Sequence, residues 1–124
     1  MNLVLWIIAG LLAAAFAGAG LMKLTQPKAK LAASGMAWTE DFSDGQVQGI
    51  GAVEVLGAIG LILPAALGIA EILTPLAAAG LAVTMVGAAI THLRRGEGNM
   101  VPINVVLGGL ALFVAVMRFG PNAF

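Results

Sequence analysis

The chain contains no cysteine and no tyrosine, and its 124 residues include a single histidine. Without cysteine it offers no thiol nucleophile, no disulfide and no iron–sulfur ligand, and the redox compartment stays open. Without tyrosine, phenol and tyrosyl-radical chemistry are excluded as well. A dedicated metal centre normally recruits several histidines or carboxylates together. We therefore predict no metal site.

Charged residues are also scarce, and the two signs balance. Only 10% of the residues are charged, six basic against six acidic, so the formal net charge is zero. Nucleic-acid binding needs a concentrated positive field, which this chain lacks. With 60% hydrophobic residues and a mean hydropathy of +1.03, the chain has too few polar residues to cover a soluble globule. The composition predicts an integral membrane protein whose first partner is the lipid bilayer.

Four apolar runs match the roughly 20 residues that a membrane-spanning helix needs. We expect these helices at residues 3–22, 49–68, 74–93 and 101–119, with one longer loop at residues 23–48. Prolines and glycines interrupt the chain between the runs, as breakers of helices do. Two connections are short, so the helices that they join should be antiparallel neighbours. The predicted fold is an all-α membrane protein, a four-transmembrane-helix bundle that forms one domain over residues 1–124.

The first run and the long loop each leave an alternative open. The first run also suits a cleaved signal peptide, because small residues at Ala15, Ala17 and Ala19 resemble cleavage sites. Against this, no basic residue precedes the run. In the loop, residues 27–36 suit a short helix in the headgroup region, with Leu31 and Trp38 turned toward lipid. A partly ordered polar loop is the alternative.

Basic residues gather on one side of the predicted bundle. The loops after the first and third helices carry Lys23, Lys28, Lys30, Arg94 and Arg95. The other side carries only one basic residue, near the end of the fourth helix. The positive-inside rule places the two basic loops in the cytoplasm and both termini outside. We therefore predict a protein of the cytoplasmic membrane with extracytoplasmic termini.

Small residues recur at helical spacing on all four predicted helices. The stripes are Gly10, Ala14 and Gly18; Gly51, Gly57, Ala58 and Ala65; Gly80, Thr84, Gly87 and Thr91; and Gly108, Ala111 and Ala115. Small residues let membrane helices approach closely. We expect the stripes to be packing faces, within the bundle or toward a protein partner or a second copy of the chain. The opposite face of the second helix, with Leu56, Ile59 and Leu63, should meet lipid.

Glu54 is the only ionisable residue of the second run, and a carboxylate at such depth needs a partner. It lies on the order of 9 Å below the rim, at about 1.5 Å per residue, within reach of a lysine bending down. Lys23, His92 and Asn104 lie near the same end of the other three helices. We predict that these four residues form one polar cluster, either a structural ion pair with hydrogen-bonding neighbours or a ligand site.

Three further residues are candidates for this site. Trp38 offers an aromatic wall, and Thr91 offers a hydrogen-bond donor. Arg118, near the opposite rim, is the third. We predict no catalytic residue, because the chain has no nucleophile–base pair, phosphate-binding loop or metal-ligand spacing.

The most distinctive stretches of the chain are AGAGLMKLTQP, GIGAVEVLGAIGLILP, LTPLAAAGLAVTMVGAAITHLRRGE and NVVLGGLALFVAVMRFGP. They cover nearly the whole chain and resemble the DoxX-like family of small bacterial four-helix membrane proteins. This resemblance implies the bacterial cytoplasmic membrane. The family's roles range from a subunit of a thiosulfate:quinone oxidoreductase, through a membrane partner of superoxide-handling complexes, to distant assembly chaperones of receptor channels. The resemblance brings no set of catalytic residues, and any cysteine chemistry of a relative has no counterpart here.

Three function classes remain open. The favoured one is a non-enzymatic membrane subunit, scaffold or assembly partner with a polar intramembrane site around Glu54. The second is a quinone-linked redox-accessory subunit, in which Lys23 or His92 hydrogen-bonds a carbonyl. The third is a small transporter or proton relay that uses Glu54 and His92. No cofactor is predicted, and a quinone or a lipid is the candidate ligand.

Overall fold

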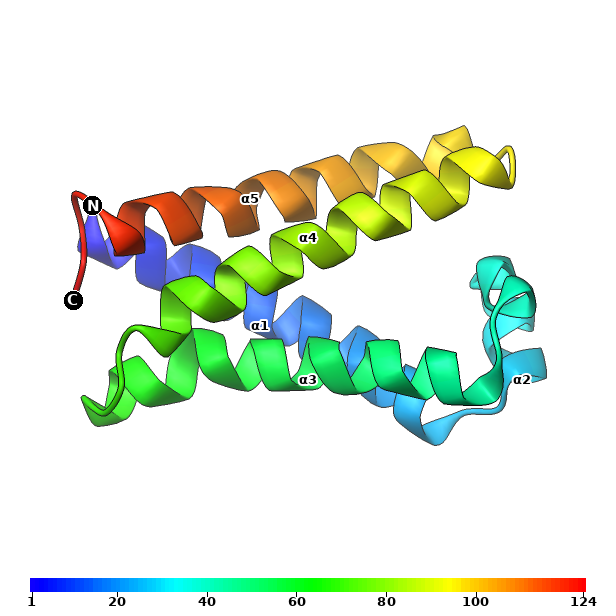
Figure 1. Cartoon of the computed structure of the whole chain (residues 1–124), viewed down its shortest axis with the longest axis horizontal. Helices are drawn as coiled ribbons and strands as arrows, with labels where there is room; N and C mark the ends of the chain where they lie inside the picture. The colour runs from blue at the N-terminus through cyan, green and yellow to red at the C-terminus, as the bar shows by residue number, and fades with distance from the viewer.

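The structure, a computed structural model that describes residues 1–124, is built from helices. The four long ones are α1 (Asn2–Thr25), α3 (Asp44–Leu67), α4 (Leu73–Arg94) and α5 (Val101–Phe119). The short ones are α2 (Lys28–Ala33), η1 (Ala37–Asp41) and η2 (Gly98–Met100). Each long helix, the last one together with η2, is long and apolar enough to cross a membrane. The predicted all-α bundle with four spans is confirmed (Figure 1).

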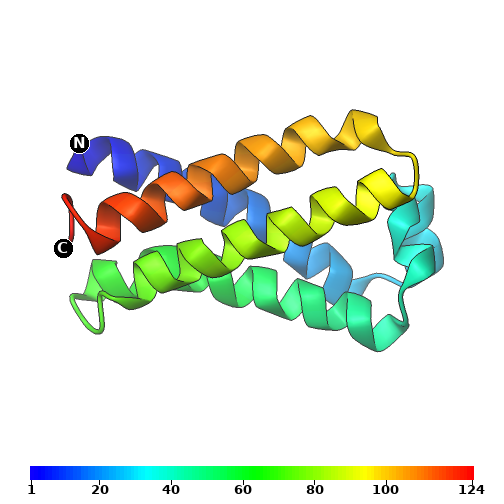
Figure 2. The ribbon, with the colours of Figure 1, turned by 45° about the horizontal axis from the view of Figure 1, so that its top comes forward.

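The long helices pack as two pairs. α1 lies along α3 and α4 lies along α5, while α3 joins the pairs through its contact with α4. Both termini lie at one end, here called the terminal end, and α2, η1 and the α4–α5 connection lie at the other, the loop end (Figures 1 and 2). In both views α3 and α4 are closest near their short connection and separate toward the loop end.

The start of α3 differs from the sequence prediction. The helix begins at Asp44, five residues before the predicted start, because Ser43 and Gln46 form a capping box. The Ser43 hydroxyl accepts from the Gln46 amide at 3.1 Å, and the Gln46 side chain accepts from the Ser43 amide at 2.9 Å. A search for apolar runs misses this polar first turn. Glu54 consequently lies about three turns into its helix instead of about two.

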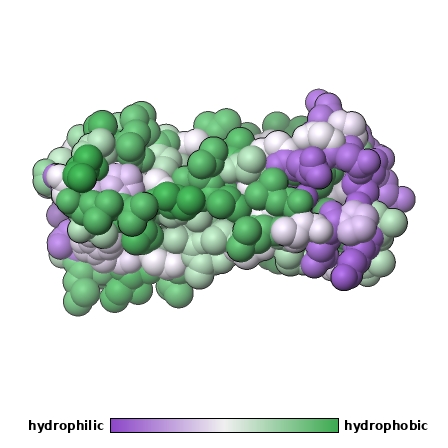
Figure 3. All heavy atoms as spheres, turned by 90° about the horizontal axis from the view of Figure 1, so that it is seen from below, coloured by the Kyte–Doolittle hydropathy of each residue, from purple (hydrophilic) through white to green (hydrophobic).

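Apolar side chains fill the middle of the bundle and cover its outside. All four long helices contribute to one buried core, with Leu5, Leu12, Phe16, Leu61, Leu81, Met85 and Val114 among its members. Leu56, Ile59 and Leu63 point outward, as predicted for a lipid-facing surface. Figure 3 shows hydrophobic residues along the length of the helices and hydrophilic residues gathered at the loop end. The bundle therefore has an apolar belt and one strongly polar cap.

The small-residue stripes of α3 and α5 are packing faces, as predicted. Gly51 and Ala58 are buried on α3, and Ala111 and Ala115 are buried on α5. A Cβ added to Gly108 would lie 3.0 Å from the Met85 Cβ of α4. Close approach of these helices therefore depends on the missing side chains.

The glycines of the α1 and α4 stripes lie on the outside of the bundle, so they do not pack within it, and a role toward a protein partner or a second copy stays a prediction. Gly10, Gly18, Gly80 and Gly87 are exposed, and a Cβ on any of them would meet nothing within 4 Å. These helices turn their larger apolar residues inward, because those side chains fill the space between the two helix pairs. Helical spacing identifies a stripe of small residues but does not say whether it faces the bundle.

The long loop folds back onto the bundle, so the expected contact of Leu31 with lipid is wrong. α2 lies within the predicted range, but the Leu31 side chain is fully buried instead of turned toward lipid. Trp38 lines an interior cavity. The Lys28 ammonium donates a hydrogen bond to the Phe42 carbonyl, which ties the beginning of α2 to the end of η1. The segment is thereby held as a cap on the loop end.

α1 and α3 approach each other closely at Gly20 and Gly51. A Cβ on Gly20 would lie 2.7 Å from the Gly51 carbonyl oxygen, and a Cβ on Gly51 would lie 2.7 Å from the Gly20 oxygen. The latter Cβ would also lie 2.8 Å from the Cβ of Lys23. Neither position has room for a methyl group. The crossing brings Lys23, three residues beyond Gly20, against α3.

We expect Gly51→Ala to lower the stability of the bundle by about 1 to 3 kcal/mol, because the new methyl group overlaps the backbone of α1. Gly18→Ala is the matched control: its methyl group enters open space, and alanine favours a helix over glycine by about 1 kcal/mol. Thermal unfolding in detergent measures both. Equal or higher midpoints for Gly51→Ala than for Gly18→Ala would contradict the crossing described here.

Candidate functional site in the loop end

A cavity of about 460 Å³ lies inside the loop end, between the α1–α3 pair and the α4–α5 pair. All four long helices and η1 contribute residues to it. Most of its wall is apolar, with side chains such as Phe16, Ile50, Met85, Ile103 and Leu107. A volume of this size is typical of sites for small molecules. The predicted polar residues interrupt this apolar wall.

Lys23 and Glu54 form the ion pair expected from the sequence. The Lys23 ammonium donates to the Oε1 atom of Glu54, and the two side chains are only 8% and 3% exposed. The ammonium also lies 5.5 Å from the centroid of the Trp38 ring, within the range of a cation–π contact. Pairing offsets much of the cost of removing two charges from water. The pair therefore holds α1 to α3 at the wall of the cavity.

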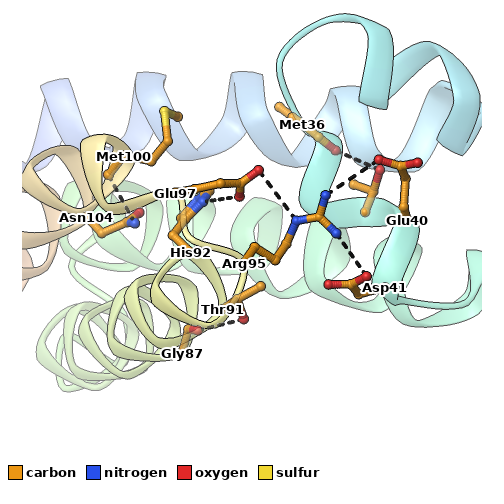
Figure 4. Close-up of polar contacts among 11 residues, drawn as sticks. Met36, Glu40, Asp41, Gly87, Thr91, His92, Arg95, Glu97, Met100 and Asn104 are labelled. Atoms are coloured by element: carbon orange, nitrogen blue, oxygen red, sulfur yellow. Dashed lines mark hydrogen bonds and ion pairs between the residues drawn. The ribbon is translucent and has the colours of Figure 1, made fainter.

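His92 and Asn104 occupy the wall formed by α4 and α5. The Nδ1 atom of His92 lies 3.0 Å from a carboxylate oxygen of Glu97, and the Asn104 amide donates to the Met100 carbonyl at 3.3 Å (Figure 4). A carboxylate can only accept, so Nδ1 carries the proton toward Glu97. These bonds leave the Nε2 atom of His92 and the Oδ1 atom of Asn104 without a protein partner. Both atoms remain for a ligand.

The four predicted site residues therefore line one cavity as two separate pairs. No hydrogen bond links the Lys23–Glu54 pair to His92 or Asn104. The four residues thus face one space from opposite walls, and that space is a cavity, which helical spacing and depth do not reveal.

The three additional candidates fall in different places. Trp38 lies on the cavity wall, where its ring meets that of Phe42 edge to face at 5.6 Å. Thr91 also lines the cavity, but its hydroxyl donates to the Gly87 carbonyl of its own helix. Arg118 is buried at the terminal end, where it donates to the Asn122 carbonyl at 3.0 Å. Arg118 is therefore not part of the cavity.

Arg95 joins the cap to the end of α4, a connection that the sequence analysis missed. Its guanidinium lies 2.9 Å from Asp41, 3.6 Å from Glu40 and 3.4 Å from Glu97 (Figure 4). Gly96, with φ of 71°, turns the chain so that Glu97 also reaches back to His92. A glycine just after a helix is a readable stop signal. The choice of acidic partners across the loop carries no such signal.

The contacts of Arg95 with Glu40, Asp41 and Glu97, here called the Arg95 bridge, shift the pKa values of two of these groups. A hydrogen bond with Asp41 raises the pKa of the Arg95 guanidinium. Hydrogen bonds with His92 and Arg95 lower the pKa of Glu97 below its ordinary value. A carboxyl group whose pKa is lower in the folded than in the unfolded state stabilises the fold at pH values above its unfolded-state pKa. This stabilisation is lost as the pH falls through the folded-state pKa. The bridge is therefore intact at neutral pH and weakens only in acid.

The sequence model of the DoxX-like family matches residues 7–114 of the chain. This range contains every residue that lines the cavity and ends before Arg118. No curated protein and no solved structure matches the chain.

We expect Lys23→Ala and Glu54→Ala each to destabilise the bundle by about 3 kcal/mol, because removal of one partner leaves the other charge buried and unpaired. The double variant should lose less than the sum of the two. A double-mutant cycle in detergent measures this coupling, and a value below about 0.5 kcal/mol would show that the pair does not stabilise the fold.

Proposed function

The chain belongs to the DoxX-like family, and from its geometry we propose that it is a non-enzymatic membrane subunit that holds a small molecule in its intramembrane cavity. The observation that carries the proposal is the cavity itself, an apolar space bounded on two sides by buried polar residues. The two threonine hydroxyls on its wall, those of Thr84 and Thr91, donate to carbonyls of their own helix. Neither is aimed at a general base, which supports binding over catalysis.

The polar atoms of the cavity suit an uncharged ligand. Lys23 is neutralised by Glu54, so this wall adds no net charge, yet the ammonium retains two further donor positions. Across the cavity, His92 and Asn104 each have a polar atom without a protein partner. A molecule with carbonyl or hydroxyl groups at opposite edges would meet both walls. A charged group on the ligand would find no free counter-ion, because the charges on the cavity wall are already paired.

A quinone-linked redox-accessory subunit is the second candidate function. A quinone head is a flat ring with two opposed carbonyls, and Trp38 and Phe42 supply an aromatic surface beside the Lys23 ammonium. The lysine is placed to donate to one carbonyl. In this second function the protein is not itself catalytic. It is the subunit that positions the quinone for a partner protein.

The geometry does not favour the third class, a transporter or proton relay. The polar residues of the cavity are confined to the loop end, and the core of α1, α3, α4 and α5 closes the bundle beyond them. Glu54 is also engaged by Lys23 instead of being joined to His92. A proton would find no chain of polar groups leading to the terminal end.

We further propose that the loop end faces the cytoplasm of a bacterial cell. Lys28, Lys30, Arg94 and Arg95 all belong to the segments at this end. The translocation of positively charged short loops is disfavoured, so such loops stay inside. The terminal end would then face outward, and the cavity would lie in the cytoplasmic half of the membrane.

Binding can be followed through the two tryptophans, which lie at opposite ends of the bundle. In Trp6→Phe, Trp38 is the only tryptophan and lines the cavity. We expect a benzoquinone to quench it saturably in detergent, and Asn104→Leu to weaken this binding about five-fold through loss of one hydrogen bond. In Trp38→Phe, only Trp6 reports, and quenching should rise linearly. Linear quenching of Trp38 as well would contradict a binding cavity.

The cysteine-free chain allows a direct test of orientation. Ala29 and Ala123 are exposed at the loop end and the terminal end, respectively. In intact cells, a membrane-impermeant maleimide should label Ala123→Cys and spare Ala29→Cys until the cells are opened, because the basic loop stays inside. The reverse pattern would place the loop end outside.

A further inference from the structure

The cavity adjoins a groove on the lipid-facing side of α3 and α4, with which it shares lining residues. A hollow of about 510 Å³ shares Phe42, Ile50 and Thr84 with the cavity. Through Val53 it meets a second hollow of about 500 Å³, which extends to Pro64 and Leu73 near the α3–α4 connection. We call these two hollows the α3–α4 groove. It leads from the side of the cavity toward the terminal end of the bundle.

The groove exists because α3 and α4 have small residues where they approach each other. Gly57 and Gly60 of α3 face Leu81 and Ala77 of α4 so closely that an added Cβ would lie within 2.8 Å of either neighbour. Exposed apolar side chains such as Leu56 and Leu76 form the sides. The groove has no charged residue. The α3–α4 groove is thus largely apolar and open to the acyl chains of the bilayer.

We propose that the ligand of the cavity carries a single long apolar tail, which lies in the α3–α4 groove while the uncharged head occupies the cavity. This inference deepens the binding function proposed above and rests on it. The groove adjoins the cavity at one place, beside Phe42, Ile50 and Thr84, which suits a ligand with one tail. Because every charge on the cavity wall is already paired, the head carries carbonyl or hydroxyl groups instead of a phosphate.

The same geometry makes the bilayer the route by which the ligand arrives. At the water-facing end, Arg95 ties the cap to the end of α4 through Glu40 and Asp41, and the Lys28–Phe42 hydrogen bond holds the cap together internally. On the lipid-facing side, α3 and α4 separate toward the loop end (Figures 1 and 2). A membrane-dissolved molecule can slide its head past Ile50 and Thr84 while its tail stays among the lipid chains.

Gly80 provides a test, because it lines the groove while a Cβ placed on it meets nothing within 4 Å. Gly80→Leu therefore fills the groove without disturbing the bundle. Gly10→Leu is the matched control, since Gly10 is equally open but lies on α1, outside the groove. Both changes are made in Trp6→Phe, and Trp38 quenching is measured with a benzoquinone ring and with the same ring bearing a decyl chain.

We expect Gly80→Leu to weaken binding of the tailed probe about ten-fold, the size of one steric overlap, and to leave the bare ring unaffected. Gly10→Leu should change neither. A second measurement uses the Trp6→Phe parent and a tailed probe with a photoreactive group at the far end of its tail. The probe should label α3 and α4, and mass spectrometry of peptides identifies the labelled residues. Labelling spread evenly over all four helices would overturn the proposal.

The remaining outcomes separate this inference from the function on which it rests. If both probes quench saturably and Gly80→Leu affects neither, the cavity binds ligands but the groove holds no tail. If neither probe saturates in the parent, the binding function fails and the inference fails with it. If Gly80→Leu instead changes the oligomeric state in native mass spectrometry without altering tail dependence, the groove is a helix interface, and the proposal is wrong.

Discussion

The pairing of Lys23 with Glu54 is the constraint on which the loop end depends. Two charges lie in an apolar interior, and neither can remain there without the other. Lysine reaches the acid only because α1 and α3 cross at Gly20 and Gly51, where the backbones touch and the Lys23 Cβ fits against a residue with no side chain. The glycine crossing and the ion pair are therefore one feature. A bulkier crossing would move the ammonium away from its carboxylate.

This pair also decides what kind of space the bundle can enclose. Since the charges cancel within the α1–α3 wall, the cavity beside them can stay otherwise apolar without attracting a counter-ion. On the opposite wall, Glu97 orients the His92 ring from outside the cavity, so the ring can present its other nitrogen inward. Beyond these residues the bundle is filled by its core. The result is a one-ended site, polar near the cap and closed toward the termini.

The bilayer explains which features could be predicted from sequence. A spanning helix needs about 20 apolar residues, so four runs predict four helices, and a lone acid within a run predicts a nearby cation. Periodicity cannot say which face of α1 or α4 turns inward, because Gly10 and Gly80 lie on stripes as regular as the one containing Gly51. The fold of the cap is set by tertiary contacts of Leu31 and Arg95, and neither contact has a local sequence pattern. The cavity likewise depends on how far the two helix pairs lie apart, and no local sequence pattern encodes that separation.

The Arg95 bridge gives the cap a role in this arrangement. Three acidic residues surround one guanidinium, and two of them, Glu40 and Asp41, belong to η1, so opening the cap would break both of these contacts. The side-chain hydrogen bond that joins α4 to α3, from the Thr74 hydroxyl to the Gly60 carbonyl at 3.1 Å, lies near their short connection, away from the loop end. The cap is therefore held at the loop end by charge pairs, whereas this hydrogen bond between α3 and α4 lies toward the terminal end. Under the proposed binding function, this arrangement favours entry of the ligand from the membrane over entry from water.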